Sequence, residues 1–211
     1  MLTCMSRHLH AIATSPRGHE SWSRKALELF VDGYLLKFPN ATVSERDTTS
    51  LPHLSYEALV AGRTNIADHT PEQATAFALQ AEIVNEVEHC SHLVFATPMW
   101  NWSTPSSLKA WVDHFVNIRT FYGAPSVIAG KPITVIISSG GLYSEGPQAV
   151  NDTLRPWFQN FFARLGATEF TFLNCDPTGP MDWGGQDPDA PDAAWFKVKN
   201  QIEQRLSEID R

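Results

Sequence analysis

Five short runs of strand-forming residues alternate with longer segments of helical periodicity along this chain of 211 residues. The run Ile133–Ser138 constrains the fold most, because its first five residues are an unbroken β-branched series. Such a series is typical of a strand that is covered on both faces, as in a parallel sheet. The other predicted strands are Leu9–Thr14, Ala41–Glu45, Leu93–Thr97 and Glu169–Asn174.

The segments between these runs predict helices. Thr70 and Pro71 form a typical helix start, and apolar residues then follow at the spacing of a buried helix face. Strands alternating with helices imply right-handed β-α-β crossovers and an open parallel sheet in one α/β domain, residues 1–211. Ligands of such sheets bind at the carboxyl ends of the strands. Further helices are predicted at Ser21–Lys37, around Ser55–Ala61, and at Pro105–Phe115, Leu154–Leu165 and Asp192–Ile209.

Composition excludes several classes of function. The formal net charge of −7 disfavours binding to nucleic acid and to anionic membrane surfaces. The apolar runs are too short to span a bilayer, and the N-terminus lacks the apolar core of a signal peptide. Cys4, Cys90 and Cys175 are odd in number, widely separated and match no metal-ligand spacing. We therefore expect a cytoplasmic protein without a metal site.

The loop after the first strand has the features of a phosphate site. Ser15, Ser21 and Ser23 supply hydroxyl groups, Arg17 supplies a positive charge, and a helix N-terminus supplies free backbone N–H groups. The loop is neither a Walker A motif nor a GxGxxG fingerprint, which disfavours ATP and dinucleotides. The alternative is a serine-rich helix cap that binds nothing.

The loop after the third strand is rich in flat side chains. Met99, Trp100, Asn101 and Trp102 follow Pro98, and backbone N–H groups in such a loop can line the edge of a planar ring. The alternative is an aromatic cluster that closes the hydrophobic core. Trp111, in the following helix, is expected to lie in that core.

The loop after the fourth strand carries paired glycines. Gly140 and Gly141 allow the backbone to approach a ligand closely, Ser138 and Ser139 precede them, and Tyr143 offers a hydroxyl donor. Taken alone, the glycines are also compatible with a plain turn. Three such loops at the predicted carboxyl edge together favour a mononucleotide with a flat ring.

These residues resemble the FMN-dependent NADH-azoreductases and their quinone-reductase relatives, from about His8 to Leu165. The resemblance implies a flavodoxin-like three-layer sandwich, with a five-stranded parallel sheet in the order 2-1-3-4-5 and helices on both faces. Ser139 departs from the family, which usually has arginine there. The matching pieces are Ser15-Pro16-Arg17, Ser21 with Ser23, Pro98–Trp102, Pro105–Asp113, Thr120-Phe121, and Gly140-Gly141 with Tyr143.

The resemblance also implies a cofactor site. Ser15, Ser21, Trp22 and Ser23 would hold the FMN phosphate. The isoalloxazine ring would lie along Pro98, Met99, Trp100, Asn101 and Trp102. Its pyrimidine end would face Ser138, Ser139, Gly140, Gly141 and Tyr143.

The implied activity is ping-pong hydride transfer from NADH or NADPH through FMN to a quinone or an aromatic azo compound. The flavin carries the chemistry, so no catalytic side chain is expected. The family is homodimeric. Two alternatives remain open: a flavodoxin-like electron carrier and a non-catalytic flavin-binding regulator. The loop 175–191, which contains Trp183, is expected to cover the pocket or the dimer partner.

Overall fold

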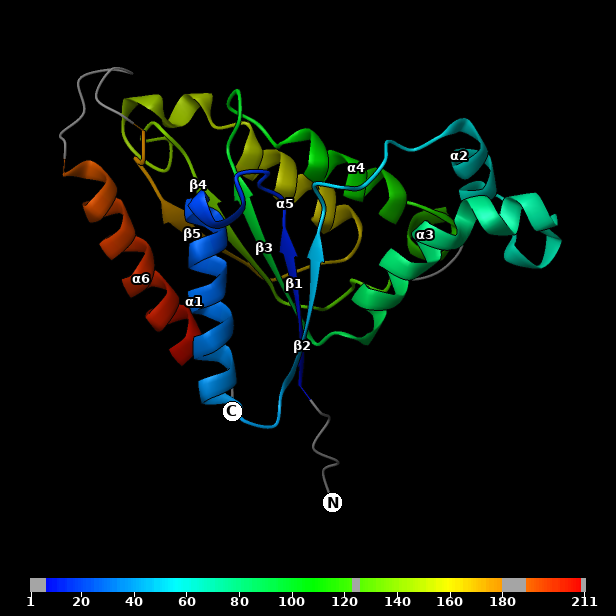
Figure 1. Cartoon of the computed structure of the whole chain (residues 1–211), viewed down its shortest axis with the longest axis horizontal. Coiled ribbons are helices and arrows are strands. Elements are labelled where there is room, and N and C mark those ends of the chain that lie inside the picture. Colours follow the sequence, from blue (N-terminus) through cyan, green and yellow to red (C-terminus); the bar gives the residue numbers. More distant parts are fainter. Residues whose placement is uncertain (1–6, 123–125, 180–188, 210–211) are drawn as a thin grey trace.

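Parallel pairing of five strands in the order β2-β1-β3-β4-β5 fixes the architecture, as the computed structural model shows in Figure 1. The structure describes residues 7–122, 126–179 and 189–209, so Trp183 and most of the predicted loop 175–191 lie outside the described residues. The predicted sheet and its order are confirmed. The strands are β1 (His8–Ala13), β2 (Thr42–Asp47), β3 (His92–Pro98), β4 (Ile133–Ser138) and β5 (Phe170–Cys175).

Burial along the strands follows their place in the sheet. Every residue of β3 and β4 is buried, as the β-branched run predicted for β4. The edge strand β2 has no buried residue and pairs with β1 alone among the described strands. Register aligns Pro98 with Ser138 and Ser138 with Cys175, so the carboxyl ends of β3, β4 and β5 lie side by side.

Helices cover both faces of the sheet. Helices α1 and α6 pack on one face, around Phe30 and Val198, and helices α3, α4 and α5 pack on the other, around Phe95 and Phe158. The α-helices are α1 (Trp22–Lys37), α2 (Tyr56–Arg63), α3 (Pro71–His89), α4 (Ser106–Phe115), α5 (Leu154–Arg164) and α6 (Ala190–Glu208). Shorter helical turns are η1 (Gly18–Glu20), η2 (Ile66–Asp68), η3 (Ile118–Tyr122) and η4 (Pro147–Asn151).

Local sequence signals set where the helices begin and end. Thr70 and Gln73 form the complete capping box at the start of α3. Gly166, just beyond α5, has a φ of 87°, a conformation that glycine adopts without strain. Trp111 of α4 is fully buried and stacks on Phe115 with ring centroids 4.9 Å apart, so it is a core residue as predicted.

Because all five strands run the same way, the loops that follow them gather at one edge of the sheet, toward the top of Figure 1. In the described part of the chain, no helix combines the length and the apolar character needed to cross a bilayer.

Candidate functional site

A cavity of about 320 Å³ lies at the carboxyl edge of the sheet. Its walls come from the loops that follow β1, β3, β4 and β5, so segments distant in sequence meet there. The volume lies in the range of small-molecule and cofactor pockets. The lining residues are Ser15, Arg17, Ser21, Trp22, Pro98, Met99, Trp100, Ser138, Ser139, Gly140, Thr178 and Gly179.

The β1 side of the cavity is built on the N-terminus of α1. Ser21 caps this helix, and its Oγ accepts a hydrogen bond from Arg24 N at 3.4 Å. The Arg24 side chain donates from Nε to the Ser15 carbonyl at 2.7 Å and pairs with Asp47 at 2.6 Å. The loop is thereby fastened to the first turn of α1 and to the end of β2. A helix N-terminus with hydroxyl groups and Arg17 beside it favours an anion.

The β3 side contains a tight turn over residues 100–103. Trp100 and Ser103 exchange two backbone hydrogen bonds, each of 3.0 Å. The two residues between them, Asn101 and Trp102, have φ angles of 49° and 62°. Asparagine tolerates this left-handed region, whereas a bulky tryptophan there is strained by roughly 1–3 kcal/mol.

Contacts on both sides hold the strained Trp102 in place. Its indole Nε1 donates to the Tyr143 hydroxyl at 3.2 Å. Its carbonyl accepts from the backbone N–H and the hydroxyl of Thr153, at 3.0 and 2.6 Å. The closing bonds of the turn do not use the N–H groups of Asn101 and Trp102, which leaves both groups as donors in the turn next to Trp100, which lines the cavity.

The β4 and β5 sides are joined by backbone hydrogen bonds that continue the strand pairing. Thr178 N donates to Ser139 O at 2.9 Å, and Gly179 N donates to Gly140 O at 3.0 Å. A Cβ on Gly179 would lie 2.7 Å from Gly140 O. The two backbone segments can therefore approach this closely only because residue 179 is glycine.

Residues 7–200 match the model of a protein family described by a flavodoxin-like fold. The chain belongs to this family. It is 34% identical over 172 residues to an FMN-dependent NADH:quinone oxidoreductase of Parafrankia, covering 79% of this chain and 82% of that one. A protein of the same name from Hyphomonas neptunium is 32% identical, covering 92% and 93%.

Solved structures agree on the fold of this flavodoxin-like chain. An azoreductase from Bacillus anthracis superposes with a TM-score of 0.79 at 23% sequence identity, covering 96% of this chain and 100% of that one. The likeness confirms the flavodoxin-like architecture that the resemblance implied.

The structure brings most of the predicted site residues of this flavodoxin-like chain together. Five lie outside the cavity lining. Ser23 is buried with its Oγ 3.1 Å from Ser21 Oγ, Asn101 and Trp102 form the turn, and the Tyr143 ring packs over Gly141. The nine that line the cavity are Ser15, Ser21, Trp22, Pro98, Met99, Trp100, Ser138, Ser139 and Gly140.

Sequence reasoning missed Thr178 and Gly179, which also line the cavity. The ligand contacts were predicted from the loops after the first, third and fourth strands, and the loop 175–191, which contains Thr178 and Gly179, was expected only to cover the pocket or the dimer partner. The rule that ligands bind at strand carboxyl ends applies equally to β5, so this position in the fold was the available signal.

Cys90, Cys175 and His92 form no second reactive centre in the part of the chain that the structure describes. Burial raises the pKa of the Cys90 thiol to about 11 and that of the Cys175 thiol to about 12, so both stay protonated. His92 Nε2 lies 2.9 Å from Thr134 Oγ1 inside the sheet. Among the described residues, no group of three or more potential ligands could hold a metal ion.

Proposed function

We propose that this chain is an FMN-dependent NADH:quinone oxidoreductase that also reduces aromatic azo compounds, with residues 1–211 acting as one FMN-binding domain. One observation carries the proposal: a single cavity is lined by the N-terminus of α1, which suits a phosphate, by Trp100 of the tight turn and by Gly140 of the glycine loop. The names of the Parafrankia and Hyphomonas relatives support the cofactor, the donor and the acceptor.

The chemistry of the cavity walls fits FMN along its length. Ser15, Ser21 and the N-terminus of α1, with Trp22 and Ser23 beside them, would hold the phosphate dianion. Pro98, Met99 and Trp100 would provide an apolar face for the ring. The polar atoms of residues 138–141, with Tyr143 behind them, would face its pyrimidine end.

When bound, FMN supplies the redox chemistry that carries electrons from a nicotinamide to the acceptor. The protein orients the ring and stabilises negative charge on it. The N–H groups of Asn101 and Trp102 are fixed donors in a strained, over-determined turn, so they need no reorganisation when charge develops. Solvent can protonate the products, so no acid–base pair of side chains is required.

We propose ping-pong kinetics, because one open cavity would serve the donor and the acceptor in turn. Parallel lines in double-reciprocal plots at several quinone concentrations would support this order of binding. Rates with NADH and NADPH, measured under the same conditions, define the donor. We expect NADH to be the better donor, as the names of the relatives indicate.

We further propose a cytoplasmic homodimer. The aromatic side chains of Trp100, Trp102, Phe121 and Tyr122 are 42–53% exposed, and a second copy of the chain would cover part of this apolar area. Cys90 and Cys175 are free thiols, as expected in a reducing compartment. Light scattering of the purified protein would report the mass of two chains if the proposal is correct.

The direct experiment is an absorbance spectrum of the purified protein, followed by anaerobic addition of NADH. We expect a yellow protein, or one that becomes yellow with added FMN, whose flavin absorbance is bleached by NADH and restored by a quinone. A colourless protein that neither binds FMN nor supports NADH oxidation would contradict the proposal. FMN binding without turnover would favour the electron carrier or the regulator.

A further inference from the structure

Asp176 is a buried carboxylate just beyond β5 that none of the predicted ligand contacts uses. Its side chain is 2% exposed. It accepts hydrogen bonds from Tyr143 N at 3.3 Å, Ser144 N at 3.0 Å and Ser144 Oγ at 3.0 Å. Lys197 Nζ of α6 lies 3.6 Å from Asp176 Oδ1 and partly compensates the charge. A buried carboxylate with this many donors is a strong local constraint on the loop that it binds.

The loop that Asp176 binds leads to the strained turn. Two of the three hydrogen bonds come from the backbone N–H groups of Tyr143 and Ser144. They fix the backbone position from which the Tyr143 side chain extends. The Tyr143 hydroxyl in turn accepts the indole N–H of Trp102 at 3.2 Å. Two hydrogen bonds, linked through the side chain of Tyr143, therefore connect Asp176 at the end of β5 with Trp102 in the turn after β3.

The same segment also fastens the start of the glycine loop. Backbone N–H groups of Thr178 and Gly179 bond to Ser139 and Gly140, and Thr178 Oγ1 donates to the Ser139 carbonyl at 3.0 Å. Residues 176–179 thus hold the segment 139–144 at both ends. The start of that segment, Ser139 and Gly140, lines the cavity.

We propose that Asp176 is the positioning residue of the flavin site. It holds the 139–144 loop and, through Tyr143, sets the orientation of Trp102 and of the donor groups in the turn. The inference rests on the proposed FMN site for its effect on the cofactor. The coupling between Asp176 and Trp102 is a property of the protein itself and can be measured without flavin.

Asp176→Ala tests the inference, with two matched variants. Asp176→Asn keeps an oxygen that can accept from the two backbone N–H groups. Thr134→Val is the structural control, because Thr134 is a buried hydrogen-bonding residue of β4 near its amino end, bonded to His92 and Arg205. All variants are made in the full chain and labelled with 5-fluorotryptophan. Trp102→Phe assigns the fluorine resonance of Trp102 among the seven tryptophans.

In the flavin-free protein, we expect Asp176→Ala to shift or broaden the Trp102 resonance and to leave the buried Trp111 resonance in place. FMN affinity should fall about tenfold, because two backbone donors lose their buried acceptor. Asp176→Asn should stay within about threefold of the wild type. Thr134→Val should lower the melting temperature without changing either readout.

The inference is overturned if Asp176→Ala gives the same Trp102 resonance and the same FMN affinity as Thr134→Val. Should Asp176→Ala fail to fold, Tyr143→Phe decides, since it removes only the hydroxyl that contacts Trp102. An unchanged Trp102 resonance in Tyr143→Phe then overturns the coupling between Asp176 and Trp102. If the wild type itself binds no FMN, the proposed function is wrong. The fluorine spectra of the flavin-free protein still test whether Asp176 sets the orientation of Trp102.

Discussion

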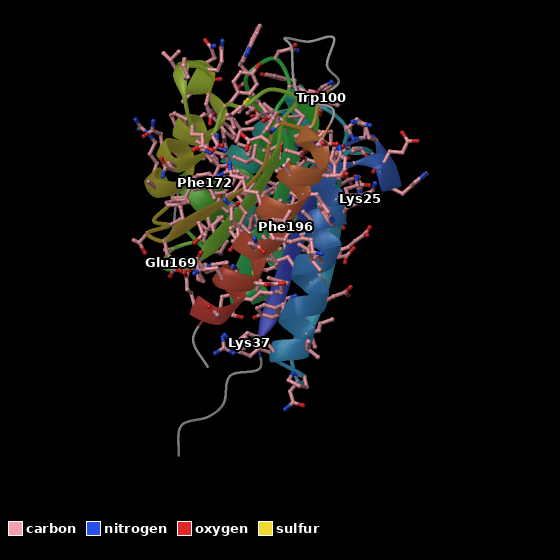
Figure 2. All side chains as sticks on the ribbon, turned by 90° about the vertical axis from the view of Figure 1, so that its left-hand side faces the viewer. Lys25, Lys37, Trp100, Glu169, Phe172 and Phe196 are labelled. Atoms are coloured by element: carbon pink, nitrogen blue, oxygen red, sulfur yellow. The ribbon has the colours of Figure 1, made fainter. Side chains whose placement is uncertain are left out.

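The two ends of the sheet use polar side chains in opposite ways. At the amino end, the histidines are bound by neighbouring side chains: His10 Nδ1 lies 2.8 Å from Ser44 Oγ, and His92 Nε2 lies 2.9 Å from Thr134 Oγ1. At the carboxyl end, the hydroxyls of Ser15 and Ser21 line a cavity. Figure 2 shows Trp100 near one end of the molecule and Glu169 well below it, toward the other.

Backbone strain also distinguishes the two ends of the sheet. The left-handed Asn101 and Trp102 lie at the carboxyl end, where neighbouring residues hold them against their preferred conformation. Polar side chains that bind one another inside a sheet stabilise a fold, whereas strained residues held beside a cavity indicate binding. We infer that the amino end supplies stability and the carboxyl end supplies function.

The largest effect is expected at Gly179. The methyl group of Gly179→Ala would meet the Gly140 backbone at 2.7–3.0 Å and force the two loops apart. We expect the free energy of FMN binding to weaken by up to about 3 kcal/mol, which raises the dissociation constant roughly a hundredfold in a fluorescence titration. Gly33→Ala is the control, because its methyl group meets only the flexible end of the Leu206 side chain. Equal affinities in the two variants would remove Gly179 from the site.

The amino end should control how stability depends on pH. Burial lowers the pKa of His92 from 6.5 to about 3, so the unfolded chain takes up a proton first as the pH falls. The His92 contribution to the free energy of unfolding should be constant above about pH 6.5 and should fall between 6.5 and 3, by about 2 kcal/mol at pH 5. In urea titrations His92→Gln should lose the His92 part of this dependence and keep the part due to His10, whose pKa burial lowers to about 4. Parallel curves for the variant and the wild type would contradict it.

Substitutions at two helix caps distinguish an effect on FMN binding from an effect on stability, and both effects should be smaller than that of Gly179→Ala. Ser21 and Ser55 each cap a helix through a side-chain oxygen, α1 and α2 respectively, but only Ser21 lines the cavity. Each change to alanine should cost about 1 kcal/mol of stability. Only Ser21→Ala should also weaken FMN binding, by roughly five- to tenfold. If Ser55→Ala weakens FMN binding as much, the effect reflects stability alone.

The smallest effect is expected from relief of strain. Trp102→Asn places a residue that tolerates the left-handed region at a φ of 62°. We expect stability to rise by about 0.5–1 kcal/mol while the rate of NADH:quinone turnover falls. Trp100→Asn, in the same turn but outside the left-handed region, should bring no gain in stability. A loss of stability in Trp102→Asn would show that the turn is not strained.

Much of the fold could be predicted because its signals are local. The β-branched run of β4, the Thr70 cap and the glycine after α5 each specify one element within a few residues. The alternation of elements then gives the parallel sheet. The cavity residues of the first, third and fourth loops follow from their places at strand ends.

The rest depends on contacts between distant segments. Gly179 matters because Gly140 lies against it, and Asp176 matters because Tyr143 and Ser144 bind it. No pattern within either loop marks these partners. The positive φ of Trp102 was equally hidden, because tryptophan has no preference for that conformation. The contacts that hold a residue in an unfavourable backbone conformation can be identified only in the folded structure.

A crystal structure of the protein with bound FMN would show where the cofactor lies. We expect the phosphate at the N-terminus of α1, against Ser15 and Ser21, and the ring along residues 98–102 with its pyrimidine end toward Ser139 and Gly140. FMN bound at any other place, or a carboxyl-edge cavity that stays empty at saturating FMN, would contradict this expectation.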